Sequence, residues 1–241
     1  MAQFTPSGYH QERAECLQSL GNILHMEHKY SEAREKLEDA LAQYTANGDQ
    51  QGRTACLQSL GNILYMEHKY PEAREKLEDA LAQYTANGDQ QGRAGCLWSL
   101  GNILHMEHKY SEAGEKLEDA LAQYTADGDQ QGRAGCLQSL GNILRMEHKY
   151  SDAKEKLEDA LAHYTANGDQ QGRAGCLWSL GDISCMEHKY SEARETLEEA
   201  LALYTANGHE EGRMYCLQSL QKVEPCFKRT HWGQFWCCFC L

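Results

Sequence analysis

The chain has 241 residues, 41% of them hydrophobic and 24% charged, a composition typical of a folded protein that buries an apolar core. Its 36 acidic residues outnumber its 23 basic residues, and the resulting net charge of −13 argues against nucleic acid as a partner. No apolar stretch is long enough to act as a signal peptide or to span a membrane, so we expect a cytoplasmic protein.

The chain repeats itself every 40 residues, since the segment 17–24 (LQSLGNIL) recurs four times with few changes. A repeat of this length predicts one structural unit stacked on the next. We expect a leader at 1–8, a capping helix at 209–224, where a sixth copy breaks at Pro225, and a tail at 225–241. The five repeats between leader and capping helix span 9–48, 49–88, 89–128, 129–168 and 169–208.

Each repeat predicts two helices, which in the second repeat run from about 49 to 69 and from 72 to 85. Gly88 ends the second of these, because glycine readily takes the left-handed conformation of a helix C-cap. Asp89 follows it and can cap the next helix, and the same Gly-Asp step recurs in three other repeats. The second helices are expected to start at a capping serine, which Pro71 replaces in repeat two: Ser31, Ser111, Ser151 and Ser191.

Both helices of a repeat are amphipathic. At 100° per residue, the apolar side chains of the first helix fall on one arc and those of the second helix on one face. In repeat one, the arc holds Cys16, Leu20, Ile23 and Leu24, and the face holds Ala33, Leu37, Ala40, Leu41 and Tyr44. Each helix pair must therefore bury its apolar surface against its neighbours.

The pattern of small and apolar residues is that of a known repeat. Leu20, Gly21, Ala33 and Ala40 fall at the spacing of the tetratricopeptide signature, with Leu17, Leu24, Tyr30 and Leu37 between them. The chain resembles the tetratricopeptide repeat family, although each repeat is longer than the usual ~34 residues. The longer repeat and the Leu-Gly-Asn segment are similar to those of the Pins/LGN adaptors. The resemblance implies an all-α, right-handed superhelical solenoid of stacked antiparallel helix pairs, whose first helices line a concave groove that binds ligands.

A polar stripe follows the first helices, nearly opposite the apolar arc. Repeats two and three differ at seven positions, and four of these lie on the exposed side of the first helix. This favours a fixed scaffold with a varied binding surface over drift of all surface positions. We expect a peptide to bind in the groove through Gln18, Asn22, His25, Gln58, Asn62, Tyr65, Trp98, Asn102, His105, Gln138, Asn142, Arg145, Trp178 and Asp182.

The asparagines of this stripe have two interpretations. Each amide both donates and accepts hydrogen bonds, so a row of them could hold the backbone of an extended ligand. The same amides could instead tie adjacent first helices together. Trp98 and Trp178 lie beside them and are expected to anchor apolar side chains of the ligand.

Other chemistry is only weakly indicated. Cys16 and its equivalents at 40-residue intervals share one helix face, and helices packed about 8–10 Å apart hold them too far apart for disulfides, so we expect free, buried thiols. His25 and His28 have a spacing that zinc could use, but the first position varies between repeats, which favours surface histidines. No catalytic group of residues recurs, so we expect neither an enzyme nor a cofactor.

The sequence thus predicts a non-catalytic scaffold that binds an extended, neutral or basic segment of a partner protein. An alternative is the ligand-sensing repeat array of a nucleotide-binding immune-type switch protein that lacks its switch domain. The last four residues, from Cys238, fit a prenylation box, so a membrane is a partner only if Cys238 is lipidated. The tail could instead pack over the last repeat or form a disordered end.

Overall fold

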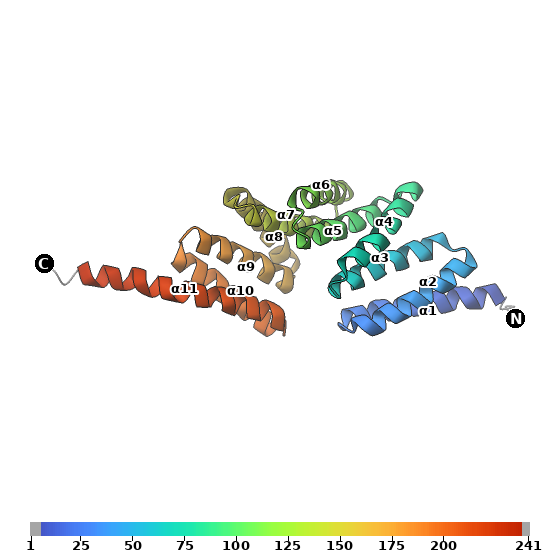
Figure 1. Cartoon of the computed structure of the whole chain (residues 1–241), viewed down its shortest axis with the longest axis horizontal. Coiled ribbons are helices and arrows are strands. Elements are labelled where there is room, and N and C mark those ends of the chain that lie inside the picture. Colours follow the sequence, from blue (N-terminus) through green and yellow to red (C-terminus); the bar gives the residue numbers. More distant parts are fainter. Residues whose placement is uncertain (1–5, 238–241) are drawn as a thin grey trace. The chain divides into compact units, whose positions relative to one another are not determined.

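The computed structural model is all-α, as the sequence predicts, and its helices follow one another in pairs (Figure 1). It describes residues 6–237 and, among them, the side chains of residues 10–223. The helices of this part are α1 (Pro6–Met26), α2 (Tyr30–Asn47), α3 (Gln50–Met66), α4 (Tyr70–Asn87), α5 (Gln90–Met106), α6 (Tyr110–Asp127), α7 (Gln130–Met146), α8 (Tyr150–Asn167), α9 (Gln170–Met186), α10 (Tyr190–Ala206) and α11 (Glu210–Cys237). None of these helices is long and apolar enough to cross a membrane.

The chain forms two compact units, and the division falls between Asp127 and Gly128. In unit 1, helices α1 to α6 pack in chain order, and α3 also contacts α1 and α5. In unit 2, helices α7 to α11 pack in the same order, and α9 also contacts α7 and α11. Within a unit, first helices are therefore neighbours, and a second helix such as α2 packs between the first helix of its own repeat and that of the next.

The predicted ends of the second helices are confirmed. Gly48 and Gly88 follow α2 and α4 in the left-handed region, with φ of 73° and 71°. Asp89 then caps α5, because its carboxylate accepts a hydrogen bond of 2.9 Å from the backbone N–H of Gly92. The same cap precedes α3, α7 and α9, at Asp49, Asp129 and Asp169.

The prediction that serines cap the second helices is wrong. Helix α2 begins at Tyr30, and its cap position is Lys29, which makes no side-chain cap bond. The reason lies at His28, whose left-handed φ of 60° turns the chain so early that Ser31 falls inside the first turn. Helices α4, α8 and α10 start in the same way after a left-handed histidine.

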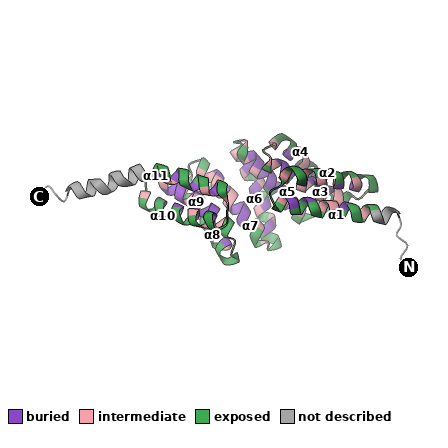
Figure 2. Cartoon of the chain, turned by 90° about the horizontal axis from the view of Figure 1, so that it is seen from below, coloured by how far each residue is buried: buried purple, intermediate pink, exposed green. Residues whose placement is uncertain are grey.

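The predicted apolar arcs are buried where helices of a unit meet, as the purple faces in Figure 2 show. A glycine in each first helix allows its own second helix to approach closely, since a Cβ on Gly61 would lie 2.5 Å from Leu77 Cγ. In α1 the arc is open instead, and Leu20 and Ile23 are 42% and 48% exposed. The core between α1, α2 and α3 holds Ala14, Leu24, Ala33, Leu37, Ala40, Tyr44, Cys56, Leu60 and Ile63.

The last helix extends further than the sequence predicts. Helix α11 runs to Cys237 and so continues past Pro225, where the sequence predicts the end of the capping helix. A proline removes one helical hydrogen bond and often kinks a helix, but it need not end it. The predicted prenylation site, Cys238, lies outside the described residues.

Candidate functional site

The predicted binding residues lie on the first helices of both units, and contacts between first helices gather them into two groups. Most of these side chains are half-buried, whereas Asn22 and Trp98 are exposed. We name the group on α1, α3 and α5 the unit 1 stripe, with Gln18, Asn22, His25, Gln58, Asn62, Tyr65, Trp98, Asn102 and His105. The group on α7 and α9 is the unit 2 stripe, with Gln138, Asn142, Arg145, Trp178 and Asp182.

The glutamines of the stripes are held by tyrosines of the second helices. Tyr84 Oη of α4 donates a hydrogen bond of 3.0 Å to Gln58 Oε1 of α3. Burial raises the pKa of Tyr84 to about 12, so its hydroxyl remains a donor at neutral pH. The equivalent bonds, at 2.9 and 3.1 Å, join Tyr44 to Gln18 and Tyr164 to Gln138. These glutamines therefore fix the two helices of a repeat, a role that the sequence alone does not indicate.

Two asparagines join neighbouring first helices. Ser99 of α5 donates a hydrogen bond of 2.8 Å to Asn62 Oδ1 of α3. Ser179 of α9 donates one of 2.7 Å to Asn142 Oδ1 of α7. At these two positions the asparagine ties adjacent first helices together, which is one of the two interpretations that the sequence leaves open. The bonded serine uses only the amide oxygen, so it leaves the two N–H donors of each amide for another acceptor.

Charge on the unit 2 stripe is neutralised within the protein. Arg145 of α7 reaches across to α9, where it pairs with Asp182 and lies 5.1 Å from the centre of the Trp178 ring. Trp178 also packs on Tyr215 of α11, with ring centroids 5.8 Å apart. The expectation that Asp182 binds a peptide needs correction, because its carboxylate is engaged by Arg145 and the residue is only 8% exposed.

The unit 1 stripe carries a row of aromatic pairs that was not predicted. In each of the three repeats of unit 1, the stripe residue nearest the end of the first helix packs on the tyrosine at which the following helix begins. The histidine of the loop between the two helices holds this tyrosine in place. In repeat two, His68 Nδ1 lies 2.9 Å from the hydroxyl oxygen of Tyr70. A repeated His-Lys-Tyr segment was the available signal. The pairs are His25 with Tyr30, Tyr65 with Tyr70 and His105 with Tyr110, at centroid distances of 5.9, 5.9 and 5.8 Å.

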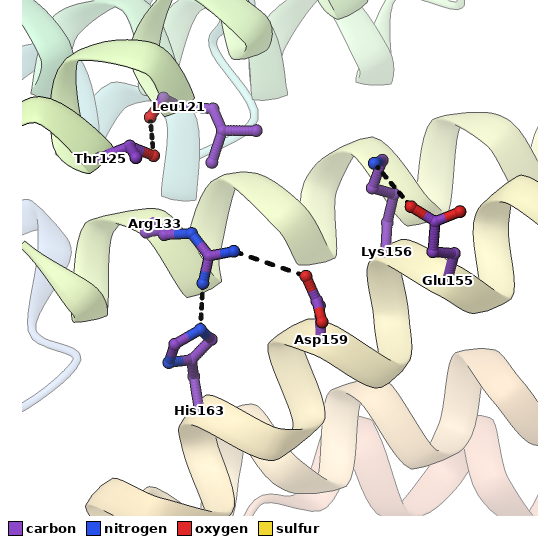
Figure 3. A network of polar contacts seen from close by, with 7 residues as sticks. All are labelled: Leu121, Thr125, Arg133, Glu155, Lys156, Asp159 and His163. Carbon is purple, nitrogen blue, oxygen red and sulfur yellow. Dashed lines mark hydrogen bonds and ion pairs between the residues drawn. The ribbon is translucent and has the colours of Figure 1, made fainter.

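A polar cluster in repeat four was also missed (Figure 3). Arg133 of α7 donates to Nε2 of His163 on α8 and, at 3.4 Å, to the carboxylate of Asp159 on the same helix. The first three repeats have glutamine in place of His163, so the cluster is particular to this repeat. Because it joins the two helices of one repeat, we assign it a structural role.

The cysteines of the first helices are free, as predicted. Burial raises the pKa of the Cys56 thiol to about 12, so this thiol is protonated and unreactive at neutral pH. Cys16 is exposed, in contrast to its equivalents, because the arc of α1 is open. In the part of the chain that the structure describes, no three His, Cys, Asp or Glu side chains gather to hold a metal ion.

Stacked helix pairs with a 40-residue period define the chain as a helical repeat protein. Residues 53–126 and 133–206 match the model of the tetratricopeptide repeat, and the chain belongs to this family. A comparison with curated proteins finds no match.

Solved structures of low sequence identity share the fold. BtubC (BKLC) from P. vanneervenii is 19% identical with a TM-score of 0.66, and the match covers 83% of this chain and 82% of that one. The repeats of a putative kinesin light chain from Podosopora anserina are 20% identical with a TM-score of 0.61, over 82% and 97% of the two chains. The Rap conjugation gene regulator of plasmid pLS20, in complex with the Phr* peptide, is 15% identical with a TM-score of 0.73, over 91% and 63%.

Proposed function

We propose that the chain is a non-catalytic, cytoplasmic interaction scaffold that binds an extended segment of a partner protein along its stripes. Within the family, the long repeat and the Leu-Gly-Asn segment lead us to place it beside adaptors of the Pins/LGN kind. The net charge of −13 favours a neutral or basic segment as the ligand, since it attracts positive and repels negative partners.

The observation that carries the proposal is the bonding of the asparagines. Because Ser99 donates to the oxygen of Asn62, the amide nitrogen of Asn62 is directed away from that serine. Ser179 orients Asn142 in the same way in unit 2. An extended peptide has a row of backbone carbonyls that need donors, and amides held in this way can supply them.

Two structures of the same fold support a binding role, because they are complexes. One is a Rap protein with competence and sporulation factor, 17% identical with a TM-score of 0.65, over 89% of this chain and 64% of that one. The other is the Rap regulator with the Phr* peptide. At such identities the likeness extends to the fold, so the binding residues have to be tested on this chain.

The test replaces Asn62, Asn102 and Asn142 together by Asp. Aspartate keeps an oxygen that can accept from the serine and removes the N–H donors, and Asp182 occupies the equivalent position in repeat five. We expect the immobilised wild-type chain to select peptides from a library of random dodecapeptides. The triple variant should bind the selected peptides at least about tenfold more weakly, since each lost hydrogen bond contributes about 1 kcal/mol.

The matched control replaces Gln50, Gln90 and Gln130 by Glu. It adds the same three negative charges at the exposed first residues of α3, α5 and α7. This control should bind the selected peptides as the wild type does, and both variants should keep the wild-type circular dichroism. If the aspartate variant binds those peptides with unchanged affinity, the asparagines are structural and the proposal is wrong.

A further inference from the structure

The aromatic pairs of unit 1 recur with one geometry in three successive repeats. Each pair joins the end of a first helix to the start of the following helix, and each is half-buried. Planar aromatic surfaces repeated at the spacing of packed helices, about 8–10 Å, make a series of equal contact sites. Unit 2 lacks the series, because Arg145 and Cys185 stand where unit 1 has His25, Tyr65 and His105.

The spacing of the aromatic pairs indicates which backbone conformation the ligand adopts. In a β-strand, successive side chains alternate between faces, so residues three apart point to opposite sides and cannot meet successive pairs equally. A polyproline II helix has three residues per turn and rises about 3.1 Å per residue, so every third side chain lies on one face about 9 Å from the last. This repeat falls within the spacing of about 8–10 Å that packed helices generally have.

The hydrogen-bonding groups of the unit 1 stripe indicate the amino-acid composition of the ligand. Ser99 occupies the oxygen of Asn62, so this amide offers the ligand donors. A proline-rich chain is the complementary partner, because proline has a backbone carbonyl but no N–H, and a polyproline II helix uses none of its carbonyls internally. Its fixed φ also reduces the entropy lost on binding.

Charge points to the same ligand. The unit 1 stripe contains no Asp, Glu, Lys or Arg. Burial and the nearby His28 lower the pKa of His25, so this ring is neutral at pH 7. A charged ligand side chain would find no partner on the stripe, whereas proline rings can pack on the aromatic faces.

We propose that the unit 1 stripe binds a proline-rich segment in the polyproline II conformation, with every third ligand residue packed on one aromatic pair. The inference rests on the proposed function and names its ligand class. Asn62 would donate to ligand carbonyls between two pairs. Trp98 lies on the same stripe, with 37% of its surface exposed, and extends the contact surface.

The experiment titrates the full chain into a fluorescein-labelled proline dodecapeptide and follows fluorescence anisotropy. A Gly-Ser dodecapeptide of the same length and charge is the reference. We expect the proline peptide to bind at least about tenfold more tightly than the reference. Tyr65→Ala should weaken binding of the proline peptide about tenfold, because it removes an aromatic anchor. Tyr65→Phe and Tyr65→His keep a ring and should retain most of the binding.

A matched pair of variants separates binding from folding. Tyr70→Ala and Tyr150→Ala remove the same tyrosine from equivalent helix starts, and each loses an equivalent contact to a loop histidine. Only Tyr70 belongs to an aromatic pair of unit 1. Tyr70→Ala should therefore weaken proline-peptide binding about tenfold, and Tyr150→Ala should leave it unchanged.

Two results would overturn the inference. One is equal affinity for the proline and Gly-Ser peptides, and the other is equal loss of binding in Tyr70→Ala and Tyr150→Ala. If the dodecapeptide library yields proline-free ligands whose binding depends on the asparagines, while the proline peptide does not bind, the scaffold function stands and the polyproline assignment is wrong.

Discussion

At the scale of single residues, the buried thiols make the protein sensitive to alkaline pH. Cys56, Cys96, Cys136 and Cys176 are fully buried, and burial raises the pKa of each from about 9 to about 12. An unfolded thiol ionises near pH 9, whereas the folded one resists ionisation up to about pH 12. The thiols therefore do not change the free energy of unfolding below pH 9, and they lower it progressively as the pH rises from 9 towards 12.

We predict that the urea midpoint of unfolding falls between pH 9 and pH 10, before the tyrosines titrate. Tyr44 and Tyr84 ionise near pH 10 when unfolded, and burial raises their pKa to about 12, so they add to the loss only above pH 10. Replacing the four cysteines by Ala should flatten the dependence between pH 9 and pH 10. A midpoint that is constant over this range in the wild type would contradict the prediction.

At the scale of one helix, two glycines of unit 1 have opposite roles. Gly114 lies inside α6, and a Cβ there would meet nothing within 4 Å. Gly101 lies inside α5, and a Cβ there would lie 2.6 Å from Leu117 Cγ, in the core. The first glycine only weakens its helix, whereas the second makes room for the neighbouring helix.

Alanine at each position should therefore have opposite effects. Gly114→Ala should raise the free energy of unfolding by roughly 0.5–1 kcal/mol, because alanine has the higher helix propensity. Gly101→Ala should lower it by roughly 1–3 kcal/mol, because α5 and α6 must move apart. Urea unfolding of both variants beside the wild type measures the two differences. Stabilisation by Gly101→Ala would show that the helices have room that the packing does not indicate.

The same scale shows which helix ends the sequence can predict. The ends at Gly88 and Asp89 depend on adjacent residues alone, through a left-handed glycine and a carboxylate that caps three residues on. The starts of the second helices depend on His68 and its equivalents, which adopt a left-handed φ that glycine would take more easily. Composition does not indicate that conformation, so the sequence wrongly predicts the serines as the caps.

At the scale of the whole molecule, the position of the candidate site could be predicted but the roles of its residues could not. Helical periodicity places Gln58 and Asn62 opposite the apolar arc, and in the structure both are half-buried. Their partners lie on other helices, Tyr84 26 residues away and Ser99 37 residues away. No local pattern predicts these bonds, which decide that Gln58 is structural and that Asn62 keeps its donors.

Repeat-to-repeat contacts also fix the register within each unit. In unit 1, Arg34 of α2 pairs with Glu67 after α3 at 3.1 Å, and Arg74 of α4 pairs with Glu107 after α5 at 3.3 Å. Lys154 and Glu187 form the same contact in unit 2, at 2.6 Å. Because these ion pairs are partly exposed, they contribute little to the free energy of unfolding. We therefore assign them the role of fixing the register between neighbouring repeats.

The equivalence of the repeats can be tested by deletion. Removing residues 49–88 joins Gly48 to Asp89 and so restores the Gly-Asp step between two helices. Helix α2 would then pack on α5, whose Cys96, Leu100 and Ile103 match the residues of α3 that it covers now, and Arg34 would meet Glu107. We expect the same helical circular dichroism per residue and a lower urea midpoint, because one repeat and one interface are lost.

A deletion of residues 49–69 is the matched control, because it removes α3 and its loop but leaves α4. Two second helices would then follow each other without a first helix between them, and α2 and α4 would each lose one of the two first helices that bury their apolar faces. This variant should lose helicity and cooperativity in unit 1. If the 49–88 deletion loses as much helicity as the 49–69 deletion, the repeats are not interchangeable units, and unit 1 depends on contacts particular to repeat two.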